Sequence, residues 1–309
     1  MSDTFFTASP EWTWWIVLYF FIGGIAGMAF VLASLLDLRG DPLDRPLVRL
    51  GYYVAIAGVA ISGLLLTVDL QRPERFWHML IQSNTGRPMF KAWSPMSVGA
   101  WGLTLFGACA FLAALAAFSE ERPDIKILQS APIRWLRRRG AAVGIAIAGS
   151  IFGLFLAGYT GVLLAVSNRP IWADSHFLGL LFLVSAGSTG AAALMLLSIW
   201  RRAGSPAAVS WLAWFDRRVL ILELLVLIVF LVSLGPVAGV FLSWWGLLLA
   251  GAVGVGIVTP LSLVSHRAAT ERQLVRGASL VLFGGLLLRM AVLLSSNAIH
   301  VLGTGVTGP

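Results

Sequence analysis

The chain has 309 residues, of which 58% are hydrophobic and only 12% are charged, with a net charge of +8. Its mean hydropathy is +0.87. A soluble domain of this length has no core large enough to bury so much apolar surface, so the composition excludes a soluble globular protein. The single cysteine, Cys109, excludes a disulfide, an iron–sulfur cluster and a thiolate metal site within the chain.

Eight apolar stretches, each near the ~20 residues that cross ~30 Å of hydrocarbon, occupy most of the chain. They predict helices, because hydrocarbon offers backbone polar groups no outside partner and the stretches lack the alternation of barrel strands. The first has no basic segment before it, which favours a retained span over a cleaved signal peptide. The sequence thus predicts an all-α integral membrane protein with eight transmembrane helices, at 13–36, 50–70, 95–118, 141–166, 175–199, 218–235, 240–264 and 278–296.

Sixteen of the 22 Lys and Arg residues lie in the connections after the first, third, fifth and seventh stretches, counting Arg218 at the boundary of the sixth stretch. The positive-inside rule then predicts that these connections face the cytoplasm and that both termini lie outside, in the periplasm. This distribution indicates contact with membrane lipids and no binding of nucleic acid. The run 137–139 of three arginines is interpreted as a topology anchor and a contact for lipid headgroups.

The two halves of the chain share a pattern of an aromatic residue followed by small residues, at 21–29 and 182–191. Small residues let neighbouring helices approach closely. Four spans in each half would give a parallel repeat of two four-helix bundles, at residues 1–170 and 171–309. The alternative is that such stretches reflect ordinary helix packing and no repeat.

Haem is disfavoured, because none of the four histidines (His78, His176, His266 and His300) lies in the middle of a span, where paired haem ligands would be needed. A secondary transporter or proton channel would more typically carry several charges at membrane depth and broken helices. Here only Glu223 and Arg289 lie clearly within spans, although Gly235-Pro236 and Thr259-Pro260 are positions where helices can break.

The strongest local signature is the segment 69–78 at the end of the second span. Asp69 at the membrane boundary, followed by Arg72, Arg75 and His78, suits a site that binds a polar head group and exchanges protons. The alternative is a helix stop in which Asp69 pairs with one of the two arginines.

A second signature is Tyr159, inside the external half of the fourth span. Its hydroxyl can bond a ligand carbonyl or, equally, a group on a neighbouring helix.

These signatures, in this order, are where the chain resembles the NrfD/polysulfide reductase family of membrane subunits, the quinone-interacting anchors of multi-subunit oxidoreductases. The resembling segments are spread over nearly the whole chain. They are Tyr19–Gly27, Asp69–His78, Ser97–Trp101, Tyr159–Gly161, Asn168–Trp172 and the region of Arg289.

The resemblance implies two four-helix bundles without haem in a bacterial inner (cytoplasmic) membrane. It implies a pocket for quinone or quinol (menaquinone or ubiquinone) near the outer face of the first bundle. It also implies two kinds of partner. A ferredoxin-like iron–sulfur subunit docks on the outer face above the pocket, and it relays electrons to or from a catalytic subunit, which in some complexes contains molybdopterin.

The resemblance also assigns site residues. Tyr159 matches the family tyrosine proposed to bond a quinone carbonyl, whereas Tyr19 falls where a characterised relative has His, and Trp15 where it has Asn. A phenol is a much poorer proton acceptor than imidazole near neutral pH, so this departure points to Asp69 or His78 for proton exchange. Asp69, Arg72 and His78 are assigned to the wall or mouth of the pocket.

Glu223 and Arg289 are interpreted as parts of a proton path from the cytoplasm toward the quinone site, because ionisable residues at membrane depth are costly. From the predicted spans, the two lie too far apart in depth to pair directly without a water chain. The alternative is a polar clamp between helices. The predicted function is therefore a quinone-reactive subunit that is not a complete enzyme alone. Its rivals are a transporter or proton channel and a passive anchor without a quinone site.

Overall fold

The computed structural model describes residues 12, 14–70, 72–167, 169–263 and 270–303. In these ranges the chain is helical, and the one β-bridge joins Ile81 to Pro88. The α-helices are α1 Trp14–Arg39, α2 Arg45–Asp69, α3 Pro95–Glu121, α4 Ala131–Leu136, α5 Arg139–Ala165, α6 Leu178–Arg201, α7 Pro206–Ser233, α8 Trp244–Val253, α9 Thr259–Leu263 and α10 Glu271–Gly303. The shorter helices are η1 Pro42–Asp44, η2 Pro73–Met79, η3 Lys126–Gln129, η4 Gly235–Leu242 and the π-helix η5 Gly254–Val258.

The described helices include seven that are long and apolar enough to cross a membrane, or eight if the bent pair of α7 and η4 counts as one span. The predicted spans therefore correspond to helices. Two histidine assignments cannot be followed, since His266 and the side chain of His300 lie outside the described part.

The sixth predicted span was wrong at its start, because α7 begins at Pro206 and not near residue 218. Ser205 caps the helix by accepting a hydrogen bond from the Ala208 amide at 3.1 Å, and proline suits the first helical position. The charges near residue 216 concealed this early start. At the other end the chain bends by 111° where η4 begins at Gly235, as the Gly-Pro pair indicated.

The predicted break at Thr259-Pro260 takes another form. The π-helix η5 carries the chain from α8 into α9, so the helix changes its winding there and is not interrupted. A proline removes one intrahelical hydrogen bond, and a π-turn is one way for a helix to accommodate such a defect.

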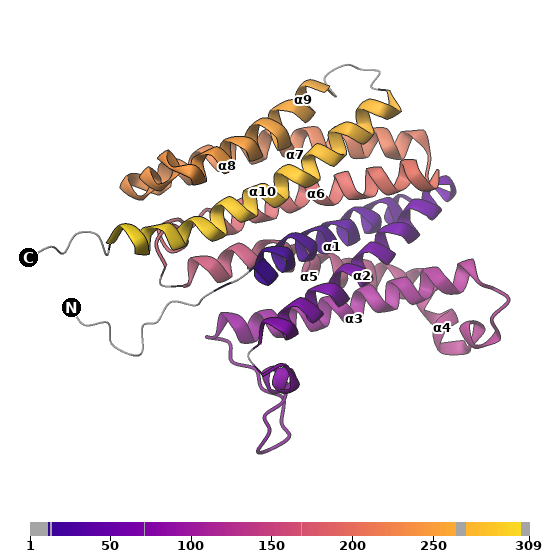
Figure 1. Ribbon diagram of the computed structural model, residues 1–309. Helices are drawn as coiled ribbons and strands as arrows, with labels where there is room; N and C mark the ends of the chain where they lie inside the picture. Colours follow the sequence, from indigo (N-terminus) through magenta and orange to yellow (C-terminus); the bar gives the residue numbers. More distant parts are fainter. Residues whose placement is uncertain (1–11, 13, 71, 168, 264–269, 304–309) are drawn as a thin grey trace, which may run out of the picture.

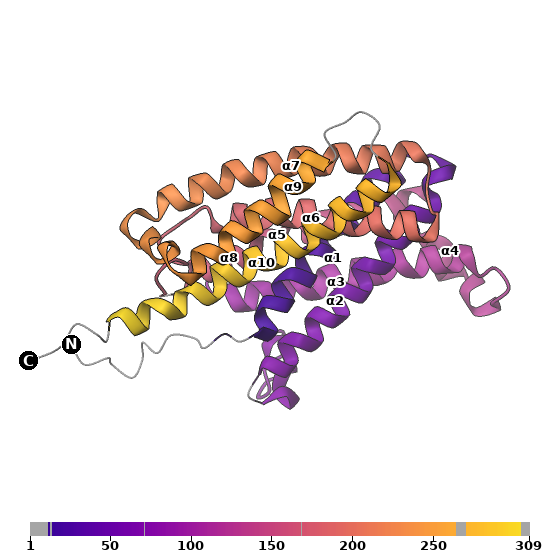
Figure 2. The same ribbon diagram turned by 45° about the horizontal axis from the view of Figure 1, so that its top comes forward.

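The centre of the molecule is formed by α1 and α6, which are the most buried spans and contact each other. Helix α1 also packs on α2 and α5, while α6 also packs on α5, α7 and α10. In both ribbon views α2, α3 and α4 lie on one side of this centre, and α7, α8 and α9 lie on the other (Figures 1 and 2). The division at residue 170 stays a prediction.

Glycines set the closest helix contacts. A Cβ atom on Gly27 of α1 would lie 2.5 Å from the carbonyl oxygen of Gly153 in α5, and one on Gly161 would lie 2.4 Å from the carbonyl oxygen of Leu178. The backbones therefore touch at positions where only glycine fits, as small-residue interfaces in membranes allow.

Helix α1 begins, and α10 ends, at the same end of the molecule (Figure 1). This agrees with an even number of spans, whereas which side of the membrane this end faces stays a prediction. We call it the outer end below, following that prediction. The connection from α2 to α3 projects from this end and exposes Trp77 by 41% and Trp93 by 81%, which suits aromatic side chains at a membrane interface.

Candidate functional site

Two of the predicted site residues, Tyr19 and Tyr159, come together between α1 and α5. Tyr19 lies in the second turn of α1 and Tyr159 near the end of α5, and both side chains are buried. They are close enough to interact electrostatically. Residues that are 140 positions apart in the sequence therefore lie near one another in the outer part of the helix bundle.

The hydroxyl of Tyr159 donates a hydrogen bond to the backbone carbonyl of Pro95, at 2.7 Å, where α3 begins. Its ring stacks on Phe155 with the centroids 5.2 Å apart. It also fills the space beside Gly99, where an added Cβ would lie 2.1 Å from the Tyr159 hydroxyl. The phenol is thus held between α3 and α5. Its one proton goes to Pro95, and the lone pairs of its oxygen stay available as acceptors.

A third polar group, Ser62 of α2, lies near Tyr19. It is fully buried, and its Oγ has no hydrogen-bond partner among the described residues. A Cβ added to Gly23 would lie 3.4 Å from this oxygen, 3.6 Å from the Tyr19 ring and 3.9 Å from Leu156. Those are ordinary contact distances, so a methyl-sized space adjoins an unpaired hydroxyl. Leaving such a hydroxyl without a hydrogen bond costs about 1–3 kcal/mol of stability. The position therefore favours a ligand with a polar group that can bond the Ser62 hydroxyl.

We call Tyr19, Ser62 and Tyr159 the tyrosine cluster. Sequence reasoning found its two phenols and missed the serine. A serine inside an apolar helix usually bonds back to its own backbone, so Ser62 carries no distinguishing signal in the sequence.

The other predicted pocket residues lie nearer the surface. Asp69 is the last residue of α2, is half-buried and interacts with another group. Arg72 precedes η2 and is exposed, and His78 is half-buried against Trp77 with ring centroids 3.9 Å apart. Trp15, in the first turn of α1, is 47% exposed. The structure therefore places these four at the same end of the bundle as the tyrosine cluster but outside its buried interior.

Glu223 and Arg289 are connected through hydroxyls of α6, contrary to the predicted separation in depth. Ser188 donates to Glu223 Oε2 at 2.9 Å, and Arg289 donates to Ser185 Oγ at 3.1 Å. The two serines are three residues apart, about one helical turn. Both charged side chains are almost fully buried.

The early start of α7 explains the error in depth. Glu223 is the eighteenth residue of α7, and Arg289 is the nineteenth residue of α10. Both helices begin at the same end, so the two residues lie ~26 Å from it, within ~2 Å of each other at 1.5 Å per residue.

Arg289 fits a site where three helices meet. Its guanidinium donates to the carbonyl of Gly285 at 2.9 Å and lies 5.7 Å from the Phe21 ring and 5.5 Å from the Phe182 ring. Its Nε has no hydrogen-bond partner among the described residues. Hydrogen bonds and aromatic faces compensate the charge only in part.

Asp216 is a further buried carboxylate that sequence reasoning missed, because it lay before the predicted span. It is 6% exposed, and its Oδ1 has no hydrogen-bond partner in the described part of the chain. It lies seven residues before Glu223, which puts both on one face of α7, ~10 Å apart. A water-sized cavity also adjoins Glu223, lined by Gly256 of η5 and Gly285 of α10.

Helices of this length and hydropathy, packed around a buried arginine and glutamate at one depth, define a polytopic membrane protein. Residues 4–300 match the family described as polysulphide reductase, NrfD. The chain belongs to this family, and the predicted resemblance is confirmed.

Three relatives are similar over much of the chain. The protein NrfD of Escherichia coli (strain K12) is 27% identical over 94% of this chain and 96% of its own length. A polysulfide reductase chain of Wolinella succinogenes is 25% identical over 82% of both proteins. A selenate reductase subunit of Mesobacillus selenatarsenatis is 24% identical over 64% of this chain and 50% of its own length.

Proposed function

We propose that this chain is the membrane subunit of a multi-subunit oxidoreductase in a bacterial cytoplasmic membrane. It exchanges electrons between membrane quinol or quinone and an iron–sulfur subunit docked on its outer face, which connects it to a catalytic subunit. The names of two relatives, each a component of a reductase, support the assembly. The observation that carries the quinone site is the tyrosine cluster, where a buried unpaired hydroxyl adjoins the Tyr19 ring and a small free space, and Tyr159 lies near Tyr19.

The hydrogen bond of Tyr159 sets how a quinol would be held. Because the Tyr159 proton goes to Pro95, its oxygen can accept a hydrogen bond from a quinol hydroxyl. The Ser62 hydroxyl is free to donate a hydrogen bond to a carbonyl oxygen of the oxidised form, the quinone. Oxidation of one quinol releases two electrons and two protons, and Asp69 and His78 lie at the same end of the bundle to take up protons. Residues 1–170 then hold the site, and residues 171–309 form the second half.

The assembly is tested by purifying the tagged protein from native membranes in mild detergent and recording its iron content and low-temperature EPR spectrum. We expect iron–sulfur signals that co-purify with the protein and change when quinol is added. A stable, iron-free protein without partners would contradict the proposal and favour a transporter, which flux assays would then test.

The second half supplies a proton path that begins at Asp216, continues through Glu223 and the serines of α6, and reaches Arg289. Glu223→Gln keeps the shape and the hydrogen bond from Ser188 but removes the ionisable group. In vesicles we expect quinol oxidation to continue while proton translocation falls about 100-fold or more, as the loss of a proton-transfer group predicts.

The matched control for this variant is Glu121→Gln. It removes a carboxylate at the last residue of α3, where Glu121 accepts a hydrogen bond from the Tyr53 hydroxyl, and it should leave proton translocation unchanged. Unchanged proton translocation in Glu223→Gln would leave only the interpretation of a polar clamp between helices.

A further inference from the structure

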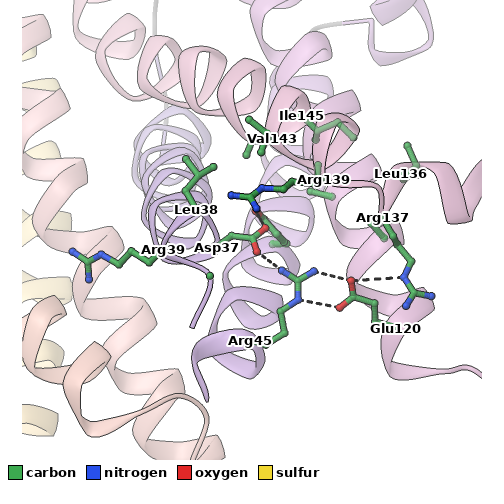
Figure 3. Close-up of a pocket in the computed structure, with 16 residues that line it drawn as sticks. Asp37, Leu38, Arg39, Arg45, Glu120, Leu136, Arg137, Arg139, Val143 and Ile145 are labelled. Carbon is green, nitrogen blue, oxygen red and sulfur yellow. Dashed lines mark hydrogen bonds and ion pairs between the residues drawn. The ribbon is translucent and has the colours of Figure 1, made fainter. Parts of the chain in front are cut away.

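A cavity of about 510 Å³ lies at the end of the molecule opposite the tyrosine cluster. It opens to the surface and is bordered by the last turns of α1 and α3, the first turns of α2 and α5, and α4. Figure 3 shows the side chains that line it. We call it the arginine cavity, because Arg39, Arg45, Arg137 and Arg139 line it together with Asp37 and Glu120.

The charges of the arginine cavity do not balance. Arg39 turns its guanidinium away from the cavity, over the Trp211 ring at 4.2 Å. The other three arginines therefore face two carboxylates, which leaves an excess of one positive charge. Arg45 lies between the carboxylates, paired with Asp37 and bonded to Glu120 at 2.8 and 2.9 Å, and Arg137 approaches the same glutamate at 3.8 Å (Figure 3). Glu120 is further shared with Arg49, at 3.5 Å. The two carboxylates are therefore already used, and the cavity favours an additional anion.

The other wall of the cavity is apolar. Small aliphatic residues of α3 and α5 form it: Ala113, Ala116, Ala142, Val143, Ile145 and Ala146. Beyond it the same two helices expose large apolar side chains, Phe111 and Phe118 on α3 and Ile147 and Ile151 on α5. These spans expose apolar surface that suits lipid tails. Trp135 of α4, 54% exposed, suits the interface beside the cavity.

We infer that the arginine cavity binds the phosphodiester headgroup of an anionic phospholipid, whose acyl chains run along α3 and α5. Guanidinium groups match phosphate geometry, and basic pockets between transmembrane helices on the cytoplasmic side bind acidic headgroups. A free phosphate or nucleotide would use the arginines but not the apolar wall. The occupant would join α1, α2, α3 and α5, the helices that hold the tyrosine cluster at their other end.

The test uses the full-length protein, delipidated in neutral detergent and titrated with phosphatidylglycerol or phosphatidylcholine. Binding is followed by native mass spectrometry and by the thermal midpoint. We expect phosphatidylglycerol to bind and raise the midpoint, and phosphatidylcholine to do neither. In the double variant Arg137→Gln/Arg139→Gln, the affinity for phosphatidylglycerol should fall at least about tenfold, as loss of charge-assisted bonds predicts.

The matched control is Arg272→Gln/Arg276→Gln, which makes the same charge change at exposed positions of α10 at the same end of the molecule. It should bind phosphatidylglycerol as the unchanged protein does. A second variant, Ala142→Phe, fills the cavity without changing charge and should also lose the lipid.

Three outcomes would overturn the inference. The first is an equal loss of phosphatidylglycerol binding in both double variants, and the second is full binding in Ala142→Phe. The third is an equal rise of the thermal midpoint with inorganic phosphate at the same concentration, which would identify a soluble anion as the ligand in place of a lipid.

Discussion

Replacing Gly27 by valine is expected to leave almost no folded protein in the membrane. The first added carbon, fixed to the backbone of α1, would lie 2.5 Å from the carbonyl oxygen of Gly153 in the backbone of α5. Neither can move away without separating α1 from α5. Overpacking of this kind costs about 1–3 kcal/mol for small additions and more where backbones touch. Helix association in a membrane depends on such close packing.

The measurement is the yield of monodisperse protein after extraction and its thermal midpoint. The matched control is Gly144→Val in α5, where an added Cβ meets no atom within 4 Å. We expect the control to resemble the unchanged protein. Equal yields of the two variants would mean that α1 and α5 do not depend on this contact.

The positions of the spans could be predicted from the sequence because they follow from the length and hydropathy of each stretch alone. The start of α7 could not, since Asp216, Arg217 and Arg218, three turns into the helix, carry charge that a hydropathy window counts against a span. Only the cap at Ser205 and the proline after it indicated the true start. This one error of about twelve residues also placed Glu223 near the membrane surface and separated it from Arg289.

The candidate site could be predicted from the sequence only in part. The contacts between its side chains could not be predicted, because they depend on how the helices pack. Tyr159 and Tyr19 could be chosen because the resemblance marked their positions. Whether the Tyr159 proton is free depends on Pro95, 64 residues away, and the sequence does not show that contact. The unpaired state of Ser62 likewise depends on Gly23 and Tyr19 across a helix interface. Such contacts depend on how helices rotate and cross, which hydropathy does not determine.

Tyr159→Phe is expected to lower quinol oxidation by the assembled complex about 10- to 100-fold, because the variant lacks the oxygen that accepts the quinol hydroxyl. The ring itself should stay in place, since its stacking on Phe155 and its fit beside Gly99 need no hydroxyl. The lost bond to Pro95 should cost only about 0.5–1.5 kcal/mol of stability. The measurements are the steady-state rate with a soluble quinol and the thermal midpoint of the same preparation.

Tyr53→Phe is the matched control, because it removes a phenol oxygen that bonds Glu121 at the opposite end of the helices. Gly99→Ala tests the position of the Tyr159 hydroxyl while keeping the hydroxyl itself. Its methyl would lie 2.1 Å from the Tyr159 hydroxyl and must displace the intact phenol, so the rate should fall although no acceptor is lost. If Tyr159→Phe and Tyr53→Phe oxidise quinol equally well, the tyrosine cluster is a packing contact and the protein is a passive anchor. If Tyr159→Phe and Gly99→Ala are both slow while Tyr53→Phe is not, the Tyr159 oxygen acts from the position in which α3 holds it.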